Sequence, residues 1–517
     1  MEVLEAANYG LLSILPPLIA IVLALITKEV IVSLMTGILV GSLIYSNGNV
    51  ISMIVTSFEV MGEKMGENVY ILIFLSLLGA LVAIVTMGGG SAAYGEMAAT
   101  KIKTRRGATL ATSALGCFIF IDDYFNCLTV GTVMKPLTDK HRISRAKLAY
   151  LIDATAAPVC IIAPISSWGA SVATYIQDAG AGNGMTTFIK IIPYNLYAIL
   201  TIVMVIIICL SKVNFGPMAR CEKNAIEHGD LFSGKETIVT EDTVDKKKGK
   251  VMDLVIPILS LMVFTVLAMV YTGGGFTGET SFFASFGESN SSLSLVIGSF
   301  GALVLTFIQY SIRKILSFRE LMEGISEGIK SMVPAFMILI LAWTISGICS
   351  TEYLNTGGYV GNLVKDANFP IFILPVMVFV IAGFLGFATG TSWGTMALLI
   401  PIGVAICSSE TTSVLLYPVL GSILAGAVYG DHISPISDTT ILSSTGAGCN
   451  HMDHVSTQLV YASLVAACSV CGYLLMGIME SAVVPFIIAL GLLIVSIIVL
   501  NKLSKKKYPI DYSNVNN

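Results

Sequence analysis

Ser-Pro-Ile-Ser-Asp at residues 434–438 and Ala-Pro-Ile-Ser-Ser at residues 163–167 each interrupt an apolar stretch with a proline followed by hydroxyl-bearing side chains. Proline removes a backbone donor and frees a carbonyl in the preceding turn, so neither stretch can continue as a plain membrane helix. A bilayer tolerates such a break only where the backbone is buried in protein or lines a wet cavity. Two similar breaks in corresponding halves of one chain predict a solute-binding site near the bilayer midplane.

The composition is typical of a membrane protein. The chain of 517 residues is 55% hydrophobic and 12% charged, which is about half the charge of a soluble domain. Its mean hydropathy is +0.84. The formal net charge of −4 gives no sign of a nucleic-acid partner, so we expect the lipid bilayer to be the main surroundings of the protein.

Long apolar runs predict an all-α polytopic membrane protein. A crossing helix needs roughly 20 apolar residues, and on this basis we expect about eleven transmembrane helices. The expected crossings lie at about residues 11–26, 30–46, 69–88, 147–176, 188–211, 251–271, 293–310, 331–350, 413–446, 456–478 and 481–500.

Two further apolar stretches are predicted to enter and leave the bilayer on one side. Basic residues flank the stretch 107–134 at both ends, and short loops rich in Lys and Arg stay cytoplasmic. A re-entrant hairpin satisfies both flanks, whereas a single crossing does not. The stretch 371–407 has no charged residue and is broken in its middle by Gly-Thr-Ser-Trp-Gly at 390–394. We expect it to form a second hairpin that enters from the opposite side.

The distribution of basic residues predicts the orientation of the chain. With the N-terminus outside and the C-terminus in the cytoplasm, only Lys64, Lys190 and Lys365 of the 29 Lys and Arg lie outside. The reverse orientation would place nearly all basic residues outside, against the positive-inside rule. The sequence therefore predicts a multi-pass protein of the cytoplasmic (inner) membrane.

The hairpins and the broken crossings divide the chain into two matching halves. Each half has three crossings, a hairpin, a broken crossing and one more crossing, and the halves start on opposite sides of the membrane. They are therefore predicted to be inverted repeats. The predicted segments are 1–211 for the first repeat with hairpin 107–134 and broken helix 147–176, 212–250 for a cytoplasmic linker, 251–478 for the second repeat with hairpin 371–407 and broken helix 413–446, and 479–517 for an extra C-terminal helix and cytoplasmic tail.

Acidic residues gather in the hairpins and breaks, where the sequence places no Lys or Arg. Ionisable groups inside a membrane are costly and usually mark functional sites. A buried carboxylate without a fixed cationic partner needs a proton or a bound cation. We predict an ion- or substrate-binding site that is formed by these acids and the neighbouring polar side chains: Asp122, Asp123, Asn126, Asp153, Ser166, Ser167, Thr391, Ser392, Asp431, Ser437, Asp438 and Thr439.

The oxygen atoms of these side chains suit a hard cation such as Na⁺. We expect Na⁺ at Asp438 together with Asp122 or Asp123, and competition between Na⁺ and a proton for these carboxylates. We expect no cofactor, because the sequence has no G-x-x-x-x-G-K-[ST] nucleotide loop.

Structural roles are open alternatives at several of these positions. A helix-capping role is possible for an Asp at the start of a helix, and short spacing of His and Asp residues allows either a metal site or a pH-sensing role. The alternatives are a cap at Asp122 or Asp123, an ion pair of Asp153 with Arg145 or Lys147, a buried pair of Asp431 and His432, and a cytoplasmic loop with metal-binding or pH-sensing His451, Asp453 and His454.

Four strings of the sequence resemble the NhaC-type sodium/proton antiporters of the larger ion transporter superfamily. They are Phe-Ile-Asp-Asp-Tyr-Phe-Asn at 120–126, Ala-Pro-Ile-Ser-Ser-Trp-Gly at 163–169, Gly-Thr-Ser-Trp-Gly-Thr at 390–395 and Gly-Asp-His-Ile-Ser-Pro-Ile-Ser-Asp-Thr-Thr at 430–440. The resemblance covers residues 10–500. It implies an elevator-like mechanism, a scaffold domain and a homodimer.

We therefore expect a secondary active transporter that exchanges Na⁺ for H⁺ by alternating access. The alternative is a Na⁺-coupled carrier or antiporter of a small organic solute, either a carboxylate such as malate or lactate or an amino acid. The shared strings do not separate these substrates. An intramembrane enzyme with an aspartate dyad is disfavoured, because catalysis does not require a duplicated architecture, and a channel is disfavoured because paired breaks are typical of alternating access.

Overall fold

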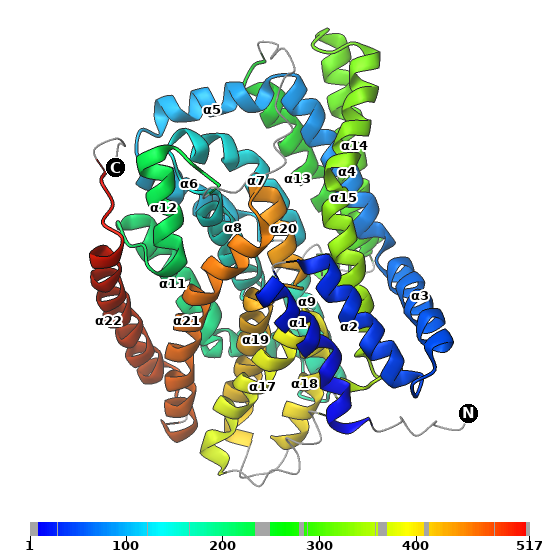
Figure 1. The fold of residues 1–517 in the computed structure, drawn as a ribbon, viewed down its shortest axis with the longest axis vertical. Helices are drawn as coiled ribbons and strands as arrows, with labels where there is room; N and C mark the ends of the chain where they lie inside the picture. Colours follow the sequence, from blue (N-terminus) through cyan, green and yellow to red (C-terminus); the bar gives the residue numbers. More distant parts are fainter. Residues whose placement is uncertain are drawn as a thin grey trace.

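The computed structural model in Figure 1 shows a bundle of helices. The structure describes residues 9–27, 29–120, 123–164, 166–232, 249–278, 284–286, 288–356, 358–359, 370–407, 413–479 and 481–512. Within this part of the chain the regular elements are helical. The predicted all-α polytopic fold is confirmed.

Seven helices of the described chain are long and apolar enough to cross a membrane, or up to ten spans if each bent helix pair counts as one. The sequence predicted about eleven crossings, and the difference lies in short or broken segments. The seven are α4 (Val69–Met87), α13 (Met252–Thr272), α14 (Ser291–Ile312), α17 (Leu374–Thr389), α19 (Leu416–Ile433), α21 (His451–Met479) and α22 (Val483–Lys507), whereas α15 (Phe318–Ile348) counts as a bent pair. The shorter helices of the first crossings are α1 (Leu15–Thr27), α2 (Val30–Tyr45), α3 (Val50–Glu67), α10 (Gly184–Ile191) and α11 (Leu196–Leu210).

The two predicted hairpin stretches each contain two helices. The first holds α6 (Arg105–Phe118) and α7 (Asp123–Lys140), and the second holds α17 and α18 (Ser392–Ile406). Figure 1 shows α6 and α7 in the upper half of the molecule and α17 and α18 in the lower half. Gly390, between α17 and α18, has φ +68°, and a Cβ atom there would lie 2.5 Å from the carbonyl oxygen of Ile436. Only glycine fits this turn without strain.

The two Pro-Ile-Ser stretches lie between consecutive helices. α8 (Arg145–Cys160) precedes the first stretch and α9 (Ser167–Asp178) follows it, while α19 and α20 (Asp438–Ala447) flank the second. The serine of each stretch caps the following helix: Ser166 Oγ accepts from the Gly169 N–H at 2.9 Å, and Ser437 Oγ accepts from the Thr440 N–H at 3.4 Å. Such caps satisfy backbone donors that a helix start leaves open.

The second arm of each hairpin packs against helices of both halves of the chain. α7 packs against α8 and α20, and α18 packs in the same way against α19 and α9. α4 also packs against α14, and α15 against α2. The division of the chain into two inverted repeats remains a prediction, and this reciprocal packing supports it.

The predicted linker 212–250 begins with a packed helix, α12 (Gly216–His228), which sequence reasoning did not foresee. Glu222 of α12 is fully buried and forms ion pairs with Arg105 at 2.5 Å and Lys147 at 3.2 Å. Burial alone raises the pKa of Glu222, but Lys147 and Arg105 outweigh that effect and lower the pKa to about 2. The ion pairs fix α12 to the starts of α6 and α8. Another helix, α5 (Gly90–Lys101), was also not predicted.

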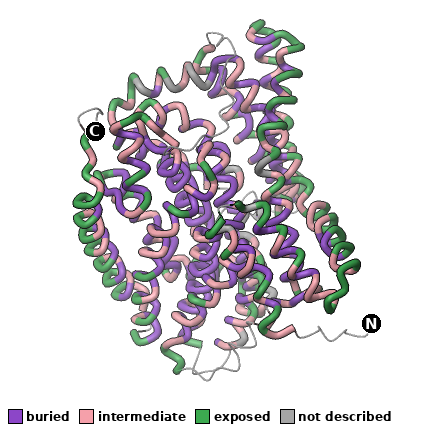
Figure 2. The backbone as a smooth tube through the Cα atoms, viewed as in Figure 1, coloured by how far each residue is buried: buried purple, intermediate pink, exposed green. Residues whose placement is uncertain are grey.

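Buried residues gather in the middle of the bundle, as Figure 2 shows, whereas α3 and α22 at its edges carry many exposed side chains. Those of α22 are mainly apolar until the last turn, where Lys505, Lys506 and Lys507 follow. Exposed apolar side chains on a crossing helix suit contact with lipid.

We predict that Gly446→Val destabilises the protein strongly. A Cβ atom at Gly446 would lie 2.5 Å from the carbonyl oxygen of Cys127, because the backbones of α20 and α7 touch at this point. Overpacking of this kind costs about 1–3 kcal/mol or more. Thermal unfolding of the purified protein should show a lower midpoint for Gly446→Val, and Gly62→Ala should leave it nearly unchanged, since nothing lies within 4 Å of that position. Equal midpoints for Gly446→Val and the wild type would contradict this close contact.

Candidate functional site

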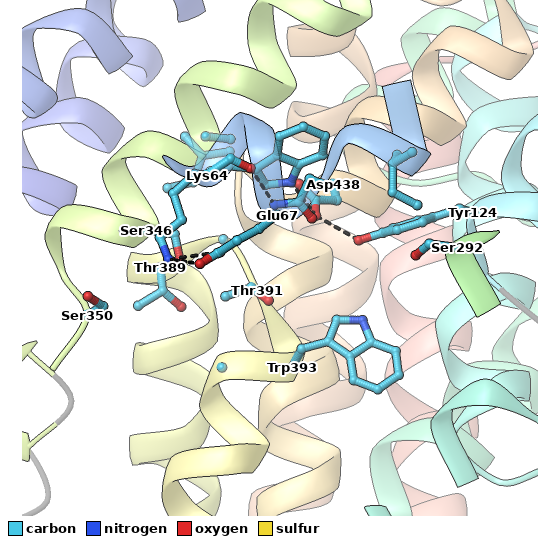
Figure 3. A pocket seen from close by; sticks show the side chains of 18 of the residues that line it. Lys64, Glu67, Tyr124, Ser292, Ser346, Ser350, Thr389, Thr391, Trp393 and Asp438 are labelled. Atoms are coloured by element: carbon cyan, nitrogen blue, oxygen red, sulfur yellow. Dashed lines mark hydrogen bonds and ion pairs between the residues drawn. The ribbon is translucent and has the colours of Figure 1, made fainter. Parts of the chain in front are cut away.

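A cavity of about 450 Å³ lies where the two hairpins, the second broken crossing and α15 meet. Figure 3 shows its polar and aromatic lining from close by. The side chains that carry the argument are Lys64, Glu67, Asp123, Tyr124, Trp343, Thr391, Trp393 and Asp438. They come from α3, α7, α15, the link between α17 and α18, the start of α18, and the start of α20.

Asp438 is the first residue of α20 and faces this cavity. Its Oδ2 accepts hydrogen bonds from the Tyr124 hydroxyl at 2.8 Å and from the Trp343 ring N–H at 3.1 Å. In the described part of the chain, no Lys or Arg forms an ion pair with it. The N-terminus of α20 favours a negative charge, but both side-chain donors are neutral. The carboxylate is therefore held in place without being paired to a fixed cation.

Asp123 begins α7 and also lines the cavity. Its Oδ1 accepts from the ring N–H of Trp168, which belongs to α9, at 2.9 Å. The ring centroids of Trp168 and Trp393 lie 4.7 Å apart. Aromatic side chains of the first broken crossing and the second hairpin therefore meet beside this carboxylate. Asp122 lies outside the described residues, and the predicted choice between Asp122 and Asp123 as partner of Asp438 stays open.

Asp431 is buried outside the lining of the cavity, and hydroxyl groups donate to its carboxylate. Its Oδ2 accepts from Ser392 Oγ at 2.8 Å, and its Oδ1 accepts from Ser437 Oγ. Ser437 Oγ is in turn 3.1 Å from Thr439 Oγ1. The alternative of a buried Asp431–His432 pair is wrong, because the ring of His432 bonds through Nδ1 to the hydroxyl of Tyr197 at 3.0 Å.

Asp153 in α8 is fully buried and has uncharged or imidazole partners. Its Oδ2 accepts from Gln458 Nε2 at 2.5 Å and lies 3.2 Å from His454 Nε2. The predicted alternative of an ion pair with Arg145 or Lys147 is wrong. Arg145 pairs with Asp139 at 2.7 Å, and Lys147 pairs with Glu222.

His451 and His454 lie in the first turn of α21, where the sequence predicted a loop. His451 Nε2 bonds to the carbonyl oxygen of Pro435 at 2.7 Å, so this carbonyl at the break already has a partner. Among the described residues, no group of three or more His, Cys, Asp and Glu side chains is arranged to hold a metal ion. The structure therefore gives no support to a metal site at His451, Asp453 and His454.

Two other predicted site residues make bonds within their own half of the chain. The Asn126 side-chain amide donates to the carbonyl oxygens of Gly116 at 2.7 Å and Ile119 at 2.8 Å, and it thereby fixes α7 to the end of α6. Ser166 Oγ donates to the carbonyl oxygen of Cys160 at 2.7 Å in addition to its capping bond. The side chain of Ser167 lies outside the described part of the structure.

The structure thus brings together Asp123, Thr391 and Asp438 from the predicted set, and it adds residues that sequence reasoning missed. Tyr124 was part of the quoted Asp-Asp-Tyr string, but its bond to Asp438 depends on long-range packing. Lys64, which the sequence analysis placed outside the membrane without a role in the site, lines the cavity. There it bonds to both carboxylate oxygens of Glu67 at 2.8 Å.

Comparison with known proteins decides the family of the chain. The sequence profile of the Na⁺/H⁺ antiporter family matches residues 159–478. The chain belongs to the Na⁺/H⁺ antiporter family. An uncharacterized protein of Haemophilus influenzae is 39% identical over 97% of each chain. The malate-2H⁺/Na⁺-lactate antiporter of Bacillus subtilis is 30% identical over 39% of this chain and 41% of its own length. The Na⁺/H⁺ antiporter NhaC of the same organism is 29% identical over 34% and 36%.

Family membership and the apolar helices together indicate a multi-pass membrane transporter. The expected resemblance to NhaC-type antiporters is confirmed. Within this antiporter family, the relatives differ in what their names say they carry. The names of these relatives alone therefore do not identify the solute that this chain carries.

We predict that Tyr124→Phe weakens cation binding at Asp438. A hydrogen bond to a charged group contributes about 1.5–3 kcal/mol, so losing this donor should raise the half-saturating Na⁺ concentration about tenfold. Na⁺-dependent dye responses in everted membrane vesicles measure the effect. Tyr429→Phe is a matched control, because that hydroxyl contacts Ser463 at 3.4 Å, and Tyr429 does not line the cavity. An unchanged half-saturation in Tyr124→Phe would show that this bond does not support cation binding.

Proposed function

We propose that the protein exchanges Na⁺ for H⁺ across the cytoplasmic membrane, and that Asp438 alternately binds the cation and the proton. The observation that carries the proposal is the pair of neutral donors, Tyr124 and Trp343, on a carboxylate that faces a cavity. A carboxylate in a membrane protein needs neutralisation. Because no Lys or Arg of the described chain forms an ion pair with Asp438, a mobile cation or a proton is the proposed source of this neutralisation.

Asp123 and the hydroxyl of Thr391 line the same cavity and are the proposed additional oxygen ligands for Na⁺. Hard cations prefer such ligands to nitrogen or sulfur. Na⁺ and a proton then compete for the same negative charge, and this competition couples the inward movement of one to the outward movement of the other. The ions are the transported substrates, and the exchange uses no cofactor.

Alternating access is proposed to move the two hairpins and the two broken crossings against the remaining helices. The cavity supports this division, since Asp123, Thr391 and Asp438 come from the first group and Lys64, Glu67 and Trp343 come from the second. The predicted orientation, with the N-terminus outside and the C-terminus in the cytoplasm, and the homodimer that the family resemblance implies both belong to this proposal.

A second candidate function is antiport of a small organic solute coupled to Na⁺. The cavity of about 450 Å³ exceeds the space of one ion and a few waters, because a water molecule takes about 30 Å³ in the liquid. The partial match to the malate-2H⁺/Na⁺-lactate antiporter also favours this candidate. Lys64 and Glu67 at the cavity offer both charges to such a solute.

We predict that Asp438→Asn abolishes exchange, because the amide carries no charge for a cation to neutralise. The purified protein in liposomes, with a pH-sensitive dye inside, is given Na⁺, Li⁺, K⁺ and a series of organic acids in turn. Wild type should move protons on Na⁺ addition, and Asp438→Asn should not. Asp230→Asn is the control, since that residue lies beyond α12 and away from the cavity.

Two outcomes would contradict the proposal in different ways. If Asp438→Asn exchanges Na⁺ for H⁺ normally, the site is wrong even though the function holds. If Na⁺ moves no protons at any pH while one organic acid accumulates with Na⁺, the second candidate function replaces the first.

A further inference from the structure

A polar network buried behind the cavity is not used by the proposed exchange at Asp438. It consists of Asp153 in α8, Thr440 and Ser443 in α20, and His454 and Gln458 in α21. All five residues are 1% exposed or less. One helix of the first half of the chain and two consecutive helices near its end meet in this network, which we call the Asp153–His454 network.

The contact between Asp153 and His454 requires a proton. His454 Nε2 lies 3.2 Å from Asp153 Oδ2 and 2.9 Å from Ser443 Oγ. A carboxylate oxygen and an unprotonated ring nitrogen are both acceptors, so they approach each other only with a hydrogen between them. Gln458 is a donor to the same carboxylate oxygen and cannot supply that hydrogen to the ring. The pair therefore holds at least one proton.

One proton on the pair leaves a net negative charge in the protein interior. With the proton on Nε2 and a bare Nδ1, the carboxylate and the neutral imidazole sum to −1. In the described part of the chain, neither Asp153 Oδ1 nor His454 Nδ1 has a hydrogen-bond partner, and no Lys or Arg pairs with Asp153. Buried net charge is costly. A second proton on Nδ1 converts the pair into a carboxylate and an imidazolium with no net charge.

We propose that Asp153 and His454 form a proton-binding site that is separate from the cation-binding carboxylate Asp438. The site takes one proton from water as its net charge changes from −1 to zero. It is distinct from the cavity, since neither residue lines it. This inference rests on the proposed exchange for its role in transport, but binding of the proton itself can be measured without transport.

Thr440 connects this site to the turn that carries Asp438. Its Oγ1 lies 3.4 Å from Asp153 Oδ2 and also 3.4 Å from the carbonyl oxygen of Asp431. A hydroxyl has one hydrogen to donate, so it serves one of these two acceptors at a time. A change of charge on Asp153 and His454 therefore alters the bond that Thr440 makes, two residues after Asp438.

Other titratable groups face the pair from neighbouring helices and enter the same equilibrium. α19 contributes Asp431 and His432, α11 contributes Tyr197, and α21 itself contributes His451, whose Nδ1 lies 3.1 Å from Ser444 Oγ. Asp153 interacts electrostatically with His432, His454, His451, Tyr197 and Asp431. A change of charge on any of these groups therefore affects proton binding at Asp153 and His454.

The direct test is ¹⁵N NMR of the full-length protein in nanodiscs with ¹⁵N-labelled histidine. The chain has 5 His residues, and the signal of His454 is assigned by its loss in His454→Gln. We expect this signal to change from the neutral to the imidazolium form as the pH is lowered, and Asp153→Asn to remove or displace that transition. A ring that stays in one protonation state throughout would overturn the inference.

A transport measurement separates the role of the site from a merely structural one. In liposomes, His454→Gln should keep Na⁺-dependent exchange but shift its pH profile or lower the number of protons moved per Na⁺. The exposed His228→Gln in α12 should behave as wild type. If His454→Gln leaves both the pH profile and the proton count unchanged, the site has no role in coupling.

If His454→Gln does not fold, Ser443→Ala is a second variant for the NMR test. It keeps the His454 ring and Asp153 but removes the hydroxyl that contacts the ring. It should displace the same NMR transition, and no displacement would count against the proposal. If wild type exchanges no Na⁺ for H⁺, the proposed function fails while the NMR titration still tests the proton site. If exchange holds and the ring does not titrate, only this inference fails.

Discussion

The carboxylate of Asp438, at the first residue of a helix and facing a cavity, is the constraint on which the rest of the structure depends. A negative charge in this position is tolerated because a helix N-terminus and two neutral donors stabilise it. Had an arginine been placed there, the charge would be satisfied permanently and nothing would need to move. In the proposed exchange, a mobile cation or a proton therefore has to neutralise this carboxylate.

The helix breaks serve this constraint by bringing helix starts into the protein interior. α7, α18 and α20 begin close to the cavity, and Asp123, Ser392 and Asp438 lie at these starts. An unbroken helix would place such residues along its side, where its own backbone donors are already used. The proline that follows one helix and the serine that caps the next thus position the proposed ion site, although neither lines the cavity.

The sequence predicted this arrangement well where the signal is local. Proline, glycine and flanking Lys and Arg marked the stretches of α6–α7 and α17–α18 and both breaks. The sequence failed where position depends on long-range packing. The bond of Trp343 to Asp438 joins residues 95 positions apart, and no periodicity indicates it. α12 was missed because its polar sequence resembles a linker. In the structure, Glu222 at its centre is fully buried and forms ion pairs with two basic residues. The predicted ion pair of Asp153 with Arg145 or Lys147 was also wrong because of long-range packing. The observed partners, Gln458 and His454, come from the far end of the chain.

Proton release from the purified protein on Na⁺ addition, in a weakly buffered detergent solution that contains a pH indicator, tests the central claim most directly. It needs no membrane gradient and no assumption about which helices move. The account predicts that Na⁺ binding releases protons at a pH where Asp438 is partly protonated, and that substitution of Asp438 by asparagine removes most of this release. Na⁺ binding that releases no protons at any pH, or a full release that persists without the Asp438 carboxylate, would contradict it.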